Sequence, residues 1–138
     1  MQIIKLDGKN VDEEYYKFID DEFNKYAEKN NITCNYMPFF YIVQDGEKLV
    51  GAITGYSYYE EVRINDLVVI EEYRKKHIGS MLVNRVIEDY RGREFKNVNL
   101  STYGFQALDF YKKLGFEVEF VRENDNKKLN KYYLIKKY

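Results

Sequence analysis

The sequence contains no tryptophan and only one cysteine, one histidine and one proline among its 138 residues. With a single cysteine, Cys34, the chain cannot form an internal disulfide. One cysteine and one histidine also argue against a zinc site, which is usually built from four ligands of these kinds. We interpret Cys34 as a packed or partly exposed thiol and not as a nucleophile, because the only histidine, His77, belongs to a basic turn with a different predicted role.

Two other features are missing, a long apolar run and a large net charge. No apolar stretch approaches the ~20 residues of a membrane-spanning helix. The first residues include Lys5, Asp7 and Lys9 in place of the apolar core of a signal peptide. We therefore expect a cytoplasmic protein that neither spans nor binds a membrane. A formal net charge of −1 argues against a dedicated nucleic-acid-binding domain.

The composition is that of a folded chain. Hydrophobic residues make up 45% of it and charged residues 33%, with basic and acidic residues in balance, so a disordered chain is excluded. A length of 138 residues is enough for one domain, over residues 1–138, with a core of its own. We attribute the fifteen tyrosines to a compositional bias and infer no stacking surface from them. Either a monomer or a homodimer is compatible with the sequence.

The pattern of apolar and turn residues predicts alternating strands and helices. Asp12 is a suitable N-cap for a first helix that ends near Lys29. A Gly46-centred turn joins two strands into a hairpin. A later strand–helix–strand unit implies one parallel pair. The predicted strands are residues 1–6, 39–44, 48–58, 61–70, 96–102, 116–122 and 131–137, and the predicted helices are residues 13–29, 78–90 and 104–114.

The segment from Asn65 to Gly79 organises the rest of the chain. Leu67 to Ile70 is a short apolar run rich in β-branched residues, which is typical of a buried strand. A basic turn follows, and from Ile78 onward apolar residues recur every three or four positions, as on an amphipathic helix. The start of such a helix offers unpaired N–H groups to an anion such as phosphate, and Gly79 lets the backbone come close to it. An ordinary strand–loop–helix joint with solvated lysines is the alternative.

Two motifs in and beyond this segment resemble a known family, the GNAT N-acetyltransferases. The first resembles the acetyl-coenzyme A motif of that family, and the second resembles a signature that the family carries at the same distance downstream. The first motif reads Arg74-x-x-His77-x-Gly79, and the second reads Ala107-x-x-x-Tyr111-x-x-x-Gly115-Phe116. The pair is much more specific than either motif alone. The resemblance is strong over residues 62–121 and looser over the rest of the chain.

The resemblance implies the GNAT acyl-CoA N-acyltransferase fold. This is an α/β fold with a central mixed sheet of about seven strands flanked by helices, in the order β-α-β-β-β-α-β-α-β-β. It also implies an enzyme that transfers the acetyl group of acetyl-CoA to a primary amine of a small molecule or protein, by direct attack on the thioester. The cofactor-binding residues that it implies are Leu67, Val68, Val69, Arg74, Lys75, Lys76, His77, Ile78, Gly79 and Ser80. No metal is implied.

The resemblance also implies a role for each part of the site. In this family the parallel strands splay apart, and the pantetheine arm of the cofactor lies in the gap. The backbone of residues 67–69 would bind the arm and stabilise an oxyanion at the acetyl group. Residues 74–80 would cradle the pyrophosphate. Tyr111 would protonate or hydrogen-bond the leaving thiolate, although a packed tyrosine on a helix is the alternative.

Three residues depart from the family pattern. His77 puts a side chain where the first motif usually has glycine. Gly104 stands where many relatives have an asparagine near the cofactor. Arg63 stands where some relatives carry a glutamate that serves as general base. A histidine could still donate a hydrogen bond to phosphate, so the effect of His77 on cofactor binding is open.

The general base is therefore not assigned by the sequence. Asp66 is the acid nearest to the expected acetyl position, but strand alternation puts its side chain on the face opposite to Leu67. A water relay is a further possibility. The other candidate acids are Glu60, Glu71 and Glu72.

Two other functions were weighed against acetyl transfer. The first is an acetyl-CoA-binding sensor or regulatory module with little catalysis, which the missing base and His77 favour. The second is a nucleic-acid-binding domain that uses Lys75, Lys76 and the lysine-rich C-terminus. The balanced charge argues against the second, because nucleic-acid binding depends on a net basic surface.

Overall fold

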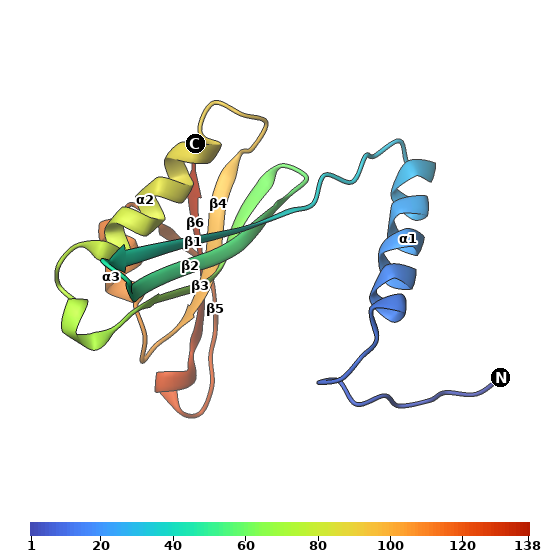
Figure 1. The fold of residues 1–138 in the computed structure, drawn as a ribbon, viewed down its shortest axis with the longest axis horizontal. Helices are drawn as coiled ribbons and strands as arrows, with labels where there is room; N and C mark the ends of the chain where they lie inside the picture. Colours follow the sequence, from blue (N-terminus) through green and yellow to red (C-terminus); the bar gives the residue numbers. More distant parts are fainter. The chain divides into compact units, whose positions relative to one another are not determined.

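The computed structural model describes residues 1–138 and divides into two compact units, residues 1–34 and residues 35–138. The first unit carries helix α1 (Glu13–Lys29), and the second carries a six-stranded sheet with two α-helices (Figure 1). Its elements are β1 (Met37–Asp45), β2 (Lys48–Tyr58), β3 (Glu61–Val69), the 3₁₀ turn η1 (Glu71–Tyr73), α2 (Ile78–Tyr90), β4 (Asn97–Tyr103), α3 (Leu108–Lys113), β5 (Glu117–Arg122), the 3₁₀ turn η2 (Lys127–Leu129) and β6 (Lys131–Lys137). None of the helices combines the length and the apolar character needed to cross a membrane.

Helix α1 has the predicted bounds, but the strand predicted over residues 1–6 is wrong. Those residues form no strand, because the first unit contains no second extended segment with which they could exchange hydrogen bonds. The helix begins with Glu13 and Glu14, which favour the positive end of its dipole. It ends at Asn30, whose side-chain amide donates to the carbonyl of Tyr26 at 2.9 Å.

The sheet of the second unit has the strand order β1-β2-β3-β4-β6-β5. All neighbouring strands are antiparallel except β3 and β4, which are parallel and connected through α2. The mixed sheet and the parallel pair predicted from the sequence are therefore confirmed, with six strands where about seven were expected. The predicted hairpin around Gly46 is present, and Gly46 supplies the positive φ of +60° that its turn requires.

Helix α2 covers one face of the sheet and forms most of the core. It packs on β1, β2 and β3, and its buried side chains are Leu82, Val83, Val86, Ile87 and Tyr90. They meet the inward-facing residues of the central strands, such as Ile53 and Val62, which are fully buried. Met81 lies three positions after Ile78 and so belongs to the apolar pattern predicted from the sequence, but it is 60% exposed.

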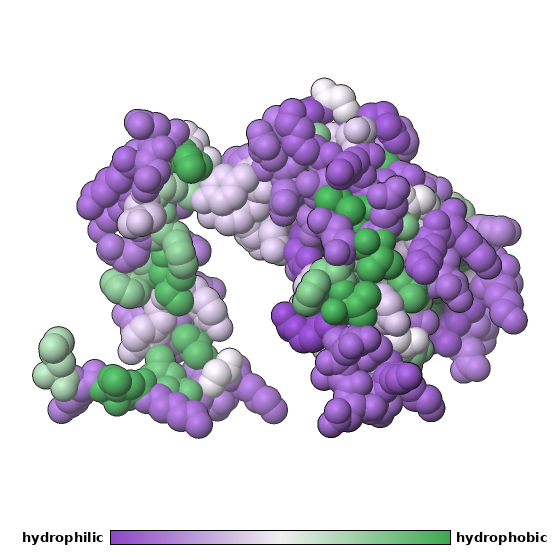
Figure 2. All heavy atoms as spheres, turned by 180° about the vertical axis from the view of Figure 1, so that it is seen from behind, coloured by the Kyte–Doolittle hydropathy of each residue, from purple (hydrophilic) through white to green (hydrophobic).

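The two faces of β1 differ as strand alternation requires. Phe39, Tyr41 and Val43 pack against the core, whereas no residue of the second unit covers Phe40 and Ile42. Seen from behind, the second unit shows apolar side chains in its middle bordered by hydrophilic ones (Figure 2). Both faces of the sheet edge are therefore apolar, although only one of them is covered by α2.

The parallel pair is short, and this shapes the functional region. β3 and β4 pair only over residues 61–63 and 97–99, although β3 continues to Val69 and β4 to Tyr103. Arg63 bridges the strands at the last pair, because its guanidinium donates to the Asn99 side chain at 3.0 Å and to the Ser101 hydroxyl at 3.1 Å. Beyond this bridge the two strands separate.

A β-bulge at Asn65 changes the direction of β3 at the same point. Thr54 of β2 pairs with Asp66, but the next residue, Gly55, pairs with Ile64, so Asn65 has no partner on β2. The bulge brings the Arg63 carbonyl close to Gly55. A Cβ atom on Gly55 would lie only 2.0 Å from that carbonyl oxygen and 2.5 Å from the ring of Phe39.

The Gly55→Ala substitution should destabilise the protein because the clash involves backbone atoms that cannot move freely. We expect a loss of about 3 kcal/mol in the free energy of unfolding. Gly8→Ala is the matched control, since a Cβ atom there meets nothing within 4 Å and φ is not positive. Urea denaturation followed by circular dichroism measures both. Equal stability of the two variants would contradict the close approach at the bulge.

Candidate active site

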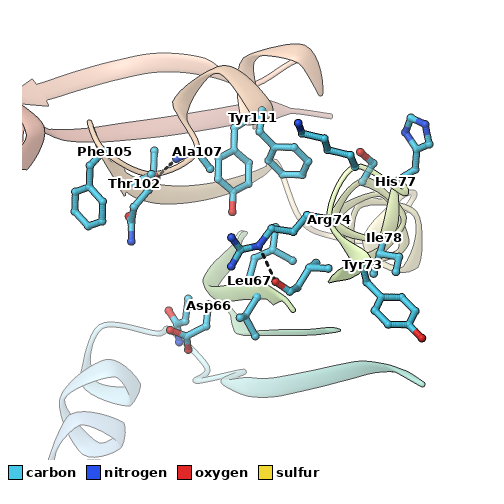
Figure 3. A pocket seen from close by; sticks show the side chains of 18 of the residues that line it. Asp66, Leu67, Tyr73, Arg74, His77, Ile78, Thr102, Phe105, Ala107 and Tyr111 are labelled. Atoms are coloured by element: carbon cyan, nitrogen blue, oxygen red, sulfur yellow. Dashed lines mark hydrogen bonds between the residues drawn. The ribbon is translucent and has the colours of Figure 1, made fainter. Parts of the chain in front are cut away.

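A cavity of about 1040 Å³ opens where β3 and β4 separate (Figure 3). Its walls are the end of β3, the loop that follows, the first turn of α2, the end of β4 and the start of α3. The structure thus gathers nine of the ten predicted cofactor-binding residues, together with Tyr111, around one space. These nine are Leu67, Val68, Val69, Arg74, Lys75, His77, Ile78, Gly79 and Ser80.

Lys76 is the predicted residue that does not line the cavity. Its ammonium group lies 4.8 Å from the centre of the Tyr73 ring, in a cation–π contact. The Tyr73 hydroxyl in turn donates to Asp45 at the end of β1. Lys76 therefore packs against the ring of Tyr73 and is not among the residues that line the cavity.

The backbone of β3 presents free hydrogen-bonding groups to the cavity. The Ile70 N–H donates to the Val50 carbonyl of β2 at 3.0 Å. Because backbone groups alternate in direction along an antiparallel strand, the N–H and C=O groups of Val68, two residues earlier, also point toward β2. Those of Leu67 and Val69 point the other way, toward the side that β4 has left. The Val69 carbonyl accepts a hydrogen bond from Arg74 Nε at 3.1 Å, which holds the guanidinium at the cavity (Figure 3).

The turn before α2 has the backbone form of an anion-binding nest. Lys75 and His77 adopt left-handed conformations with φ of 62° and 64°, separated by Lys76, whose φ is not positive. Such alternation turns successive N–H groups toward one point. None of the N–H groups from Lys75 to Ser80 donates a hydrogen bond within the protein. The nest, the positive end of the helix dipole and Arg74 together suit a phosphate group.

Tyr111 is placed by the way α3 ends. Phe116 N–H donates to the Tyr111 carbonyl at 3.1 Å, and Gly115 N–H donates to the Lys112 carbonyl at 3.0 Å. These two bonds define a Schellman motif, which needs a positive φ at Gly115, observed at +90°. The rings of Tyr111 and Phe116 pack edge to face at 5.7 Å. The four-residue distance from Tyr111 to Gly115 in the second sequence motif is therefore the distance that this helix C-cap requires.

The Tyr111 side chain is 6% exposed, and its hydroxyl projects into the cavity toward the end of β3 (Figure 3). Burial raises the pKa of Tyr111 to about 12, because desolvation disfavours the phenolate. The hydroxyl therefore stays protonated at neutral pH, as a hydrogen-bond or proton donor must.

A family model for the acetyltransferase (GNAT) family matches residues 8–116. The chain belongs to the GNAT family. Among curated proteins, none matches the sequence. The resemblance of the two sequence motifs to this family is thereby confirmed, and with it the assignment of the chain as an acyltransferase enzyme.

Solved structures show the same fold. An acetyltransferase from Bacillus cereus superposes with a TM-score of 0.79 at 23% identity, covering 99% of this chain and 98% of that one. A candidate acetyltransferase from Agrobacterium tumefaciens reaches a TM-score of 0.84 at 20% identity, with full coverage of both chains. A GNAT acetyltransferase from Elizabethkingia anophelis, solved with acetyl-CoA bound, has a TM-score of 0.64 at 18% identity over 88% of this chain and 82% of that one. The predicted GNAT fold is confirmed.

The GNAT motif explains what is unusual at His77. The residue caps α2 with a left-handed conformation, for which a glycine carries no steric penalty. A glycine at this place would adopt this conformation without a steric penalty, whereas His77 adopts it under strain. Gly79 has a different reason to be small, because a Cβ atom on it would lie 3.3 Å from the Phe110 ring of α3.

The Gly104 departure from the GNAT pattern also has a local cause. A Cβ atom on Gly104 would lie 2.8 Å from the Lys127 carbonyl, so the turn η2 occupies the space of an asparagine side chain. Gly104 and Phe105 donate their N–H groups to the Asn130 and Lys128 carbonyls. These bonds hold residues 104–107 in a turn, which is why α3 begins at Leu108 and not at the predicted residue 104.

The β4 side of the cavity was missed by the sequence analysis. Apart from Ala107, which begins the second motif, its lining side chains carry no motif that a single sequence reveals. They come from the end of β4, the turn before α3 and α3 itself. They are Ser101, Thr102, Phe105, Gln106, Ala107 and Phe110. The predicted parallel pair could have located this side of the cavity, because the ends of parallel strands lie at the same edge of a sheet. No group of three or more His, Cys, Asp and Glu side chains is gathered to hold a metal ion.

Strain at His77 predicts a stabilised variant. His77→Gly should relieve the left-handed penalty, which exceeds the entropy that glycine loses on folding, for a net gain of about 0.5–1 kcal/mol. Lys76→Gly is the matched control, because its φ is not positive and only the entropic loss of about 0.5–1 kcal/mol applies. Thermal melts of both variants and the parent measure the two effects. A drop in melting temperature for His77→Gly would show that the imidazole makes a compensating contact.

Proposed function

We propose that this GNAT protein transfers the acetyl group of acetyl-CoA to a primary amine. The observation that carries the proposal is the cavity between the separated β3 and β4, which joins an anion-binding nest at one end to the buried phenol of Tyr111 in its middle. A module that only binds phosphate would have no use for the second feature. The acetyl-CoA bound to the Elizabethkingia anophelis relative supports the choice of cofactor.

The cofactor fits the residues of the cavity in order. Its pyrophosphate would bind the N–H groups of residues 75–80 and the guanidinium of Arg74. Its pantetheine amides would pair with the N–H and C=O groups of Leu67 and the N–H of Val69, as an added strand pairs with a free edge. The N–H groups on this side of β3 would then be donors for the charge that develops on the acetyl oxygen.

The transfer itself follows from positioning. An amine attacks the acetyl carbon, the C–N bond forms and the C–S bond breaks. Tyr111, protonated at neutral pH, would donate its hydroxyl proton or a hydrogen bond to the leaving sulfur. The acceptor amine, the cytoplasmic location and the choice between monomer and homodimer stay predictions.

Binding of the cofactor can be tested without turnover. Coenzyme A at about 100 times its dissociation constant should stabilise the protein by roughly 2.7 kcal/mol, seen as a higher melting temperature. Arg74→Ala should weaken this shift because it removes the guanidinium at the nest. Arg91→Ala is the control, since Arg91 pairs with Glu88 on the surface of α2. A parent protein whose melting temperature does not move at millimolar coenzyme A would contradict the proposed cofactor.

Catalysis is tested by removing one oxygen atom. Tyr111→Phe keeps the ring and its packing, so the fold should hold while turnover falls by about 10 to 100-fold. The Michaelis constant for acetyl-CoA should change far less, because the hydroxyl acts mainly as charge builds on sulfur.

Tyr90→Phe provides the control for this measurement. Tyr90 is equally buried, at 6% exposure, but packs against Phe39 and Phe95 away from the cavity. Steady-state release of free thiol compares both variants with the parent. Full turnover in a folded Tyr111→Phe protein would leave Tyr111 as a packing residue. No turnover by the parent protein that still binds acetyl-CoA would instead favour a sensor without catalysis.

A further inference from the structure

The cavity contains one carboxylate, that of Asp66. The other acids that the sequence offered as bases do not line it. Glu71 and Glu72 belong to η1, and Glu72 forms an ion pair with Lys48 of β2 at 3.0 Å. Glu60 lies in the turn before β3. Among acidic residues, only Asp66 can therefore meet a molecule held in the cavity.

Asp66 reaches the cavity although it lies on the face of β3 opposite to Leu67. The alternation predicted from the sequence holds, but β4 has separated from β3 at this height, so the space extends around the free edge to both faces. The bulge at Asn65 sets the side chain opposite Thr54, whose hydroxyl donates to Asp66 Oδ2 at 2.7 Å. Figure 3 shows Asp66 beside Leu67, on the wall across from Tyr111.

The Asp66 carboxylate is not neutralised by a cation of the protein. It takes part in none of the ion pairs. Arg63, on the same strand, directs its guanidinium to Asn99 and Ser101 instead. Thr54 orients one carboxylate oxygen, which leaves Oδ1 and further lone pairs free to accept hydrogen bonds. An oriented carboxylate without a partner cation suits a cationic ligand.

We propose that Asp66 binds the ammonium form of the acceptor amine and takes its first proton. The proposal rests on the proposed function, because it assigns the acceptor end of the same cavity. Asp66 is then the general base that the sequence left unassigned. The acceptor class that follows is a basic primary amine, which is protonated at neutral pH and reaches the cavity as a cation.

The proton balance of the reaction is complete with these two residues. The ammonium loses one proton to Asp66 and becomes a neutral nucleophile. Its nitrogen then forms the bond to the acetyl carbon, and the C–S bond breaks. The nitrogen releases a second proton, which replaces the one that Tyr111 has given to the leaving sulfur, and the proton on Asp66 passes to water. The products are an N-acetyl amine and a free thiol, with one proton released for each ammonium consumed.

The test compares two amines of similar size and different basicity at a single pH of about 7.5, where ethylamine is almost wholly protonated and 2,2,2-trifluoroethylamine is mostly neutral. A single pH keeps the other titratable groups that face the cavity in one state. Those groups are Tyr73, Arg74, Lys75, His77 and Tyr111. The readout is kcat/KM for each amine with saturating acetyl-CoA, from thiol release.

The variant is Asp66→Asn, which preserves size and the bond from Thr54, and the matched control is Glu72→Gln on η1. With ethylamine we expect Asp66→Asn to lose at least about 10²-fold in kcat/KM, the usual contribution of a general base. With trifluoroethylamine the loss should be less than about tenfold, because this amine arrives without the proton. Glu72→Gln should match the parent with both amines.

The possible results distinguish a failure of the Asp66 role from a failure of acetyl transfer itself. Equal losses of Asp66→Asn with both amines, or no loss, would overturn the role of Asp66 while leaving acetyl transfer intact. Turnover of neither amine by the parent protein, with coenzyme A still raising its melting temperature, would overturn acetyl transfer to simple amines and this role with it. Asp66→Glu provides a second variant, and partial recovery with ethylamine alone supports proton removal over a structural effect.

Discussion

The separation of β3 from β4 after three residue pairs is the constraint on which the rest of the site depends. In a continuous parallel pair the backbone groups of Leu67 and Val69 would be used by the neighbouring strand, and no cavity would exist. Arg63 bonds across the last pair, and the bulge at Asn65 turns β3 away just beyond it. One short interruption of the ladder thus supplies free donors, space and access to both faces of β3.

The two GNAT motifs mark backbone conformations more than side-chain chemistry. The first describes a left-handed turn that directs N–H groups at an anion before α2, and His77 shows that a side chain can be carried there under strain. The second describes the C-cap of α3, in which Gly115 closes the helix and thereby aims Tyr111 at the cavity. The chemistry of the site follows from these two helix ends and from the strand between them.

The regular part of the fold could be predicted from the sequence because its signals are local. The stripe on α2, the turn at Gly46 and the Gly115 cap each depend on residues close together in the chain, and all three are present. The strand over residues 1–6 was wrong because strand formation needs a partner, which no local pattern guarantees. The start of α3 was misplaced because distant carbonyls in η2 take the N–H groups of residues 104 and 105.

The sequence by itself determined the family, the order of the main elements and ten of the cavity's residues, since these follow from periodicity and from short motifs. The ten are nine cofactor-binding residues and Tyr111. The tertiary structure alone decided which residues of β4 face them and where the parallel pair ends. It also decided that Asp66, on the opposite face from Leu67, lines the same space. Strand register and separation arise from contacts between residues more than thirty positions apart, such as Arg63 with Asn99, and no local pattern encodes them.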